Sequence, residues 1–201
     1  MSKPTPGIVS VSVAPAELPV SRELAKLHVK QQESLDDSIV DLLIQAATDS
    51  GEYETGRSWV TRTLELRLAA WPAGGVIYLH KPPVIAGAAV AVTYIDEDGV
   101  VQTVSTDVYE LVHGEWEPAL VLKPDQEWPS GLQTGRAYPI TVTYAAGYGA
   151  ASAVPAVYRG GLLLLLGHLY ENREAVIVGT SAIELPLGVE RAFHTRRIIP
   201  V

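Results

Sequence analysis

Residues 155–173 read PAVYRGGLLLLLGHLYENR, and the interpretation of the whole fold starts from this stretch. Pro155 suits the first turn of a helix, where its missing N–H group has no intrahelical partner to lose. From Ala156 to about Arg173 apolar residues recur at helical spacing, and the run Leu162–Leu166 is apolar on every side. The sequence therefore predicts a helix that is buried all round, either by its own chain or by neighbouring subunits.

Two further helices are predicted near the N-terminus. Ser21 fits the N-cap of a helix that runs to about Val29. A second helix begins at Ser34 or Asp36, and Gly56 is well placed to end it. Its expected apolar face consists of Leu35, Ile39, Leu42, Leu43, Ala46, Ala47 and Tyr53. A last short helix is expected over 187–197.

Between Trp59 and Tyr148 the apolar period changes to two, which is typical of half-buried strands. In 61–69, for example, leucines alternate with polar residues, and Asp98-Gly99 marks the turn of a hairpin. No helix-length connection separates the strands, so we expect antiparallel sheet. Seven strands are predicted, at 61–69, 76–79, 89–95, 100–106, 108–112, 120–122 and 140–144.

This order of elements predicts an α+β fold. The N-terminal helices and the long C-terminal helix are expected to form a small helical bundle, into which an antiparallel β-rich domain is inserted. The alternating, proline-rich N-terminus is interpreted as an extended arm, with a floppy terminus as the alternative. The expected divisions are the arm at 1–19, bundle helices at 20–57, the β-rich insertion at 58–149, and the long helix with its tail at 150–201.

The composition of the chain excludes several classes of function. A chain of 201 residues buries roughly 70% of its unfolded surface, enough for one substantial core. The absence of cysteine excludes disulfides, thiolate zinc sites, iron–sulfur clusters and cysteine nucleophiles. The net charge of −8 argues against a protein that grips duplex DNA, although not against one past which DNA slides. No signal peptide is expected, and no apolar run approaches the ~20 residues of a membrane span.

No catalytic or cofactor motif stands out, so we expect a protein without enzymatic activity, cofactor or metal. Asp96-Glu97-Asp98-Gly99 resembles the start of a calcium loop but lacks its later ligands, and a hairpin turn explains it better. His168 and Glu171 supply only two ligands for an ion. The tryptophans either line a sugar-binding surface or, as we favour, fill the edge of the core: Trp59, Trp71, Trp116 and Trp128.

Four stretches carry a resemblance to a known family. They are residues 19–29, PVSRELAKLHV; residues 144–149, YAAGYG, which lead through Val154 and Pro155 into the long helix; residues 168–174, HLYENRE; and residues 184–190, ELPLGVE, followed by a basic finish. In this order they resemble the head–tail connector (adaptor) proteins of long-tailed bacteriophages and gene transfer agents. Two features depart from the family's pattern: Gly160-Gly161 within the helix, and a longer proline-rich start at 1–17.

The resemblance implies a structural virion protein that is made in the host cytoplasm and lies in the neck, between capsid and tail. Such proteins form a ring, usually twelve-fold, beneath the portal, where they extend the DNA channel. The implied partners are the portal protein, the tail-side neck (stopper) protein and further copies of the chain. DNA is expected to pass through without sequence-specific binding, and no membrane is involved. Because the C-terminal segment of several relatives reaches the portal, the candidate portal contacts are Arg191, Arg196 and Arg197.

The long helix is the candidate oligomer interface, because each subunit of a ring can cover its neighbour's apolar face through a heterologous contact. The candidate interface residues are Leu162, Leu164, Leu165, Tyr170 and Arg173. Two alternatives remain. One is a carbohydrate-binding or hydrolytic accessory virion protein built on the tryptophan-rich sheet. The other is a different neck ring, such as a stopper or tail-completion protein.

Overall fold

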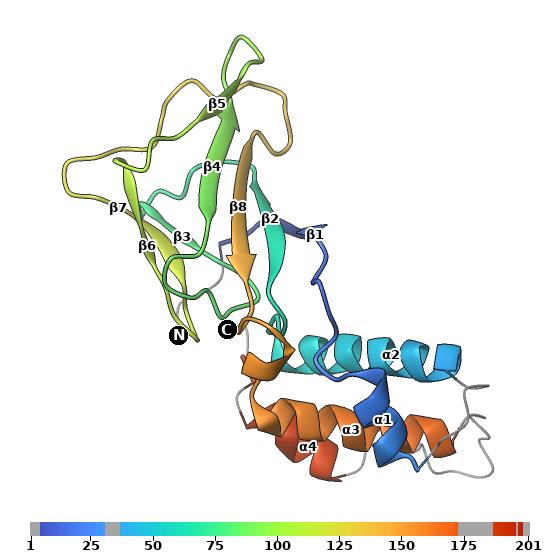
Figure 1. Cartoon of the computed structure of the whole chain (residues 1–201). Helices are drawn as coiled ribbons and strands as arrows, with labels where there is room; N and C mark the ends of the chain where they lie inside the picture. The colour runs from blue at the N-terminus through green and yellow to red at the C-terminus, as the bar shows by residue number, and fades with distance from the viewer. Residues whose placement is uncertain (1–4, 31–36, 173–186, 196, 199–201) are drawn as a thin grey trace, which may run out of the picture. The chain divides into compact units, whose positions relative to one another are not determined.

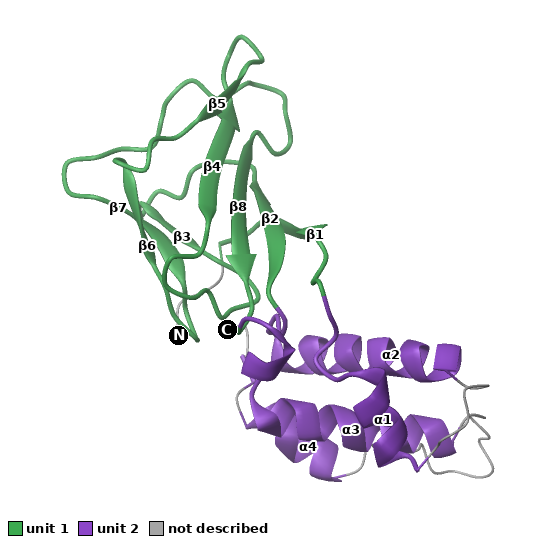
Figure 2. Cartoon of the chain, in the orientation of Figure 1, with its two compact units in different colours: residues 1–16, 61–148, 199–201 green, residues 17–60, 149–198 purple. Residues whose placement is uncertain are grey.

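The computed structural model describes residues 5–30, 37–172, 187–195 and 197–198. The chain divides into two compact units (Figure 2). Unit 1 comprises residues 1–16, 61–148 and 199–201, and unit 2 comprises residues 17–60 and 149–198. Helices together with antiparallel strands confirm the predicted α+β class. In the part of the chain that is described, every helix is too short or too polar to cross a membrane.

The described helices all belong to unit 2 (Figure 1). They are α1 (Arg22–His28), α2 (Asp37–Thr55), the 3-10 helix η1 (Ala151–Ala153), α3 (Ala156–Glu171) and α4 (Leu187–His194). Helix α3 packs against α1, α2 and α4, so segments far apart in sequence lie side by side. Its buried residues are Tyr158, Gly161, Leu162, Leu165 and Leu166.

The predicted ends of these helices are confirmed at three points. The backbone N–H of Leu24 donates to Ser21 Oγ at 3.2 Å, so Ser21 is the N-cap of α1. Helix α2 ends at Thr55, and Gly56 follows with φ +68°, a conformation that favours glycine. Helix α3 begins directly after Pro155.

The predicted apolar face of α2 is wrong in most of its positions. The residues that are buried on α2 are Val40, Ile44, Ala47, Thr48, Gly51, Glu52 and Thr55. Leu42 and Tyr53, by contrast, are 68% and 82% exposed. The inward face includes Gly51 because the Trp59 ring packs directly on it: a Cβ at Gly51 would lie 2.2 Å from Trp59 Cη2. Leu35 lies outside the described residues.

Unit 1 consists of two antiparallel sheets (Figure 1). The five-stranded sheet has the order β1-β2-β8-β4-β5 and the three-stranded sheet the order β3-β7-β6. The strands are β1 (Ile8–Val13), β2 (Arg62–Leu68), β3 (Val76–Tyr78), β4 (Val90–Ile95), β5 (Val101–Thr103), β6 (Tyr109–Val112), β7 (Ala119–Leu122) and β8 (Ile140–Ala146). Seven of them confirm predicted strands, and every pairing is antiparallel as expected.

The alternation of β2 places its leucines in the core of unit 1. Leu64, Leu66 and Leu68 are buried, and alternate residues of the paired strand β8 share the same cluster. The turn between β4 and β5 is built by Asp96, whose backbone C=O accepts from the N–H of Gly99 at 2.9 Å. Its carboxylate accepts from the N–H groups of Asp98 and Val100. The interpretation of this acidic stretch as a hairpin turn is therefore confirmed.

Strand β1 was not predicted, and residues 8–13 are an edge strand rather than a free arm. Val9 pairs opposite Leu66 of β2. Upstream of the strand, Thr5 Oγ1 accepts from the N–H of Tyr78 at 2.8 Å, and Thr5 O lies 2.9 Å from His80 Nε2. A Cβ at Gly7 would lie 2.6 Å from the carbonyl oxygen of Arg67. Residues 5–16 thus form part of unit 1.

Candidate functional site

An aromatic cluster fixes the geometry of unit 2. The rings of Trp59 and Tyr158 stack with centroids 5.2 Å apart, and Phe193 of α4 lies 5.6 Å from Trp59. Helix α2 orients the indole, because the N–H of Trp59 donates to Glu52 Oε1 at 2.8 Å and its Nε1–H donates to Thr55 Oγ1. All three rings are fully buried. Since the cluster joins α2, α3 and α4, it determines which sides of these helices face outward.

The two adjacent glycines of α3 have different surroundings. A Cβ at Gly161 would lie 2.7 Å from Ala192 Cβ and 2.9 Å from Phe193 Cε1, so only glycine permits this close approach of α3 and α4. A Cβ at Gly160 would meet no atom within 4 Å. Glycine costs about 1 kcal/mol relative to alanine within a helix. The packing of unit 2 explains that cost at Gly161, whereas no contact of the described residues explains it at Gly160.

The candidate interface residues of α3 differ in how far they are exposed. Leu162 and Leu165 are buried inside unit 2, Tyr170 is half-buried, and Leu164 is 46% exposed. Arg173 lies outside the described residues. Of the two predicted ways to bury this helix, burial by the described residues of its own chain does not extend to Leu164.

Leu164 belongs to an exposed apolar patch on α3 and α4, which we name the α3 face. Val157, Gly160 and Leu164 follow one another at i, i+3 and i+7, which places them along one side of α3. Leu187 at the start of α4 is 77% exposed, and a Cβ at the adjacent Gly188 would lie 3.2 Å from Leu164 Cδ1. The α3 face is defined as Val157, Gly160, Leu164 and Leu187.

A second apolar patch, which we name the α2 face, consists of Ile39, Leu42, Ala46 and Tyr53. These positions follow at i, i+3, i+7 and i+14, so they form one stripe along the helix. Large apolar side chains this exposed in a row are a common mark of a protein–protein contact. The helical period predicts these residues on the buried side of α2, and that prediction is wrong for all four. The small residues at the neighbouring positions, Ala47 and Gly51, are the signal that the core lies on the other side.

The candidate portal contacts lie at and beyond the end of α4. Arg191 is exposed on α4. Arg197 Nη1 lies 3.5 Å from Glu54 Oε2, and the N–H of Ile198 donates to Thr55 O at 3.0 Å, so the tail begins against the end of α2. Arg196 lies outside the described residues. The structure thus brings Arg191 and Arg197 to the exposed surface of the same unit.

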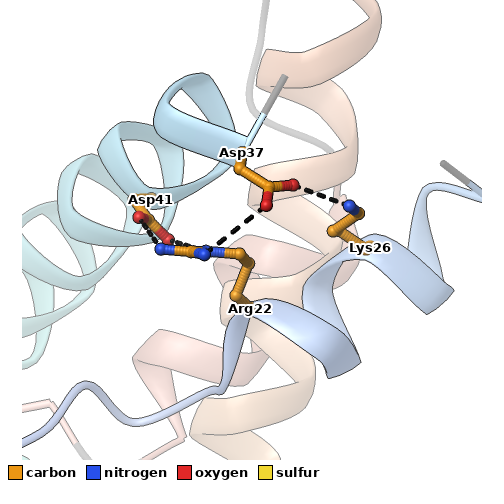
Figure 3. Close-up of polar contacts among 4 residues, drawn as sticks. All are labelled: Arg22, Lys26, Asp37 and Asp41. Carbon is orange, nitrogen blue, oxygen red and sulfur yellow. Dashed lines mark hydrogen bonds and ion pairs between the residues drawn. The ribbon is translucent and has the colours of Figure 1, made fainter. Parts of the chain in front are cut away.

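Polar contacts hold α1 against the first turns of α2 (Figure 3). The guanidinium of Arg22 makes a two-pronged contact with the carboxylate of Asp41, with Nε–H donating to Oδ1 at 2.7 Å. Lys26 Nζ donates to Asp37 Oδ1 at 2.6 Å. The hydrogen bond from Arg22 keeps the pKa of Asp41 below its usual value. This network fixes the position of α1 on the bundle.

The alternative sites of the sequence analysis do not come together. Trp59 lies in the core of unit 2, whereas Trp71 and Trp128 stack on each other in unit 1, with centroids 4.9 Å apart, and pack against its core. Trp116 is exposed. In the described ranges, no three His, Asp or Glu side chains are arranged to hold a metal ion. The tryptophans therefore do not share one surface on which a sugar ring can stack.

No protein-family model matches the chain, and no curated protein matches it. Solved structures do match. A chain from the neck of an empty gene transfer agent (GTA) particle, computed with C6 symmetry, has a TM-score of 0.79 and 22% identity, over 96% of this chain and 97% of that one. A chain from the virion of a native GTA particle has a TM-score of 0.77 and 23% identity, with coverage of 96% and 97%.

A third chain, from the neck of a native GTA particle computed with C12 symmetry, has a TM-score of 0.69 and 22% identity, over 94% of this chain and 96% of that one. At this level of identity the likeness is one of fold, and it extends over nearly the full length of both chains. The chain has the fold of proteins found in the neck and virion of GTA particles.

Proposed function

We propose that this chain is a structural protein of a virion neck, in which its copies form a ring between capsid and tail. The likeness to a neck chain over 96% of the sequence, at a TM-score of 0.79, carries the proposal. Two of the matched neck structures were computed with C6 and C12 symmetry, which favours a symmetric ring. The two exposed apolar faces of unit 2 support the same conclusion, because a ring subunit needs two contact surfaces.

Within the neck, the proposed role is that of the head–tail connector (adaptor). The ring lies beneath the portal, extends the DNA channel and provides the platform for the tail-side neck (stopper) protein. The resemblance over residues 168–174 and 184–190 supports this finer assignment. In a ring of twelve copies, the basic residues Arg191, Arg196 and Arg197 contact the portal.

The electrostatics fit a channel through which DNA passes. A net charge of −8 per subunit, repeated around a ring, repels phosphates weakly and does not retain the duplex. Tight DNA binding relies instead on clustered Lys and Arg side chains that neutralise phosphates. The proposed function is mechanical: it needs no catalytic residue, cofactor or metal.

Electron microscopy of particles from a genome that lacks only this gene tests the proposal. Heads that accumulate apart from complete tails, with DNA packaged or leaking, are the expected result. Complementation with the wild-type gene is the control and restores joined particles. Tailed particles of normal shape in the deletion strain would refute the neck assignment, and glycan-binding and hydrolase assays would then be the next step.

A second deletion strain distinguishes the adaptor role from the role of another neck ring. Heads from a strain that lacks the stopper protein are expected to retain this chain at the portal, whereas heads that lack this chain are expected to lack the stopper as well. The reverse order of attachment would make the chain a stopper or tail-completion protein and would refute the adaptor role.

A further inference from the structure

The α2 face and the α3 face lie on different sides of one compact unit. At about 3.6 residues per turn, the α2 face lies roughly opposite the buried residues of α2 that face the bundle. By the same spacing, Val157, Gly160 and Leu164 lie on the outer side of α3, away from its buried residues. Two apolar faces that point away from a shared core cannot cover each other within one subunit. The described residues of the subunit leave both faces exposed.

The two faces are bordered by side chains of opposite charge. Helix α2 contains no Lys, Arg or His, and the exposed carboxylate of Asp49 borders the α2 face. The other carboxylates of α2 are buried or form ion pairs elsewhere in unit 2. On α4, Leu187, Arg191 and His194 follow at i, i+4 and i+7, so the basic side chains share one side of the helix with the leucine of the α3 face. Arg191 and His194 are exposed. An acidic border and a basic border favour contact between the two faces over contact of either face with itself.

Gly160 leaves the α3 face without a side chain at its middle position. It lies between the larger side chains of Val157 and Leu164, and no atom of the described residues lies within 4 Å of a Cβ placed on it. A helix with a ridge of apolar side chains can approach closely at such a position. The α2 face is a ridge of this kind, with Leu42 and Tyr53 as its most exposed members.

We infer that the α2 face of one copy packs into the α3 face of the next copy around the ring. This is a head-to-tail contact, since different surfaces of two identical chains meet, and repetition of such a contact closes a ring when the rotation between copies is right. The inference rests on the proposed function, because in a closed ring every copy presents its α2 face to one neighbour and its α3 face to the other.

Cysteine crosslinking in purified particles tests the inference. The chain has no cysteine of its own, so each introduced thiol is unique. The double variant Leu42→Cys/Leu164→Cys, treated with a short bifunctional maleimide, is expected to give a ladder of species from dimer upward on a denaturing gel. Each single variant is expected to remain monomeric, because one thiol per copy cannot bridge two different faces.

The possible results of this experiment distinguish a failure of the inferred contact from a failure of the proposed neck function. Dimers from Leu42→Cys alone would show a contact of the α2 face with itself and overturn the inference. Particles that contain the double variant but give no ladder would also overturn it, while the neck assignment stands. Normal tailed particles that lack the protein altogether would refute the neck function itself.

A second variant tests the contact at Gly160 without crosslinking. Gly160→Leu fills space that is open in the subunit, so its unfolding temperature is expected to equal or exceed that of the wild type. Its incorporation into heads is expected to fall at least tenfold. Gly74→Leu, at an exposed and equally open glycine of unit 1, is the matched control and is expected to assemble normally. Normal incorporation of Gly160→Leu would overturn the inference.

Discussion

Gly161 and Ala192 lie so close that a Cβ on Gly161 would be 2.7 Å from the Ala192 Cβ. The contact brings α3 and α4 together at the edge of the aromatic cluster of Trp59, Tyr158 and Phe193. The nearest atoms are the Ala192 Cβ, which is fixed to the backbone, and the ring of Phe193, which is buried against Trp59, so neither moves aside at low cost. The position of α4, and with it the outward direction of Leu187, depends on this glycine.

Gly161→Ala is therefore expected to destabilise unit 2 although alanine is the better helix former. Overpacking of this kind costs typically about 1–3 kcal/mol, which exceeds the gain in helix propensity. Urea unfolding followed by tryptophan fluorescence measures the loss, since Trp59 reports on the cluster. Gly160→Ala is the matched control, because the added methyl meets no atom there and is expected to stabilise the helix. Equal effects of the two substitutions would contradict the packing argument.

Tyr144→Phe is expected to destabilise unit 1. The Tyr144 hydroxyl donates to the backbone C=O of His80 at 2.9 Å and accepts from the N–H of His80 at 3.1 Å. Removal of the hydroxyl leaves both backbone groups without this partner, at a cost of about 1–3 kcal/mol. Burial also raises the pKa of Tyr144, so its absorbance is expected to stay that of the neutral phenol above pH 10. Tyr53→Phe, at an exposed tyrosine, is the control and is expected to change stability little.

The sequence predicts most of the fold because its periodicity is strong where the elements are long. Strand β2 alternates so regularly that Leu64, Leu66 and Leu68 identify its buried side. Strand β1 was missed because a short Val/Ser alternation beside prolines is equally typical of an extended arm. Its pairing with β2 depends on the contacts of Thr5 and on the space at Gly7, and neither is visible in local sequence.

The candidate interface is harder to predict, since it depends on which side of a helix faces inward. In a run of five leucines every side is apolar, so the pattern does not distinguish the exposed Leu164 from the buried Leu162 and Leu165. On α2 two overlapping stripes fit the helical period. The stripe with smaller residues is inside because Trp59 packs on Gly51, and that preference comes from tertiary packing rather than from hydrophobicity.

Removal of residues 1–13 is expected to destabilise unit 1 and to promote its aggregation. Strand β1 covers the edge of β2, and an uncovered β2 presents unpaired backbone groups to other chains. Hydrogen exchange of the β2 amides, together with light scattering on warming, measures both effects. Removal of residues 1–4 alone is the control. Full protection of β2 in the chain that lacks residues 1–13 would contradict the structural role of β1.

Asp41→Asn is expected to weaken the docking of α1 onto α2 near neutral pH and to have no effect in strong acid. In the folded state the hydrogen bond from Arg22 lowers the pKa of Asp41 below the unfolded value of 3.8. The stabilisation is thus fully present above that value and is lost as the pH falls through the folded pKa. Unfolding curves from pH 7 to pH 2 for wild type and variant are expected to converge at the acid end. A difference in unfolding free energy that stays the same from pH 7 to pH 2 would show that the Asp41 carboxylate is not the source of the stabilisation.

Arg191→Glu is expected to weaken attachment of the chain to heads while leaving its fold intact. The side chain is exposed on α4, opposite the buried Val189, Ala192 and Phe193, so its replacement disturbs no packing. Reversal of its charge replaces attraction by repulsion at an acidic partner surface, whether that surface is the portal or the acidic border of the next copy's α2 face. Sedimentation of heads with the purified variant measures attachment, and Arg136→Glu makes the same change on an exposed residue of unit 1. If the additional substitution Asp49→Arg restores the binding that Arg191→Glu loses, Arg191 belongs to the contact between subunits. If Asp49→Arg does not restore binding, Arg191 belongs to the contact with the portal. Equal binding of the Arg191 and Arg136 variants would remove Arg191 from both surfaces.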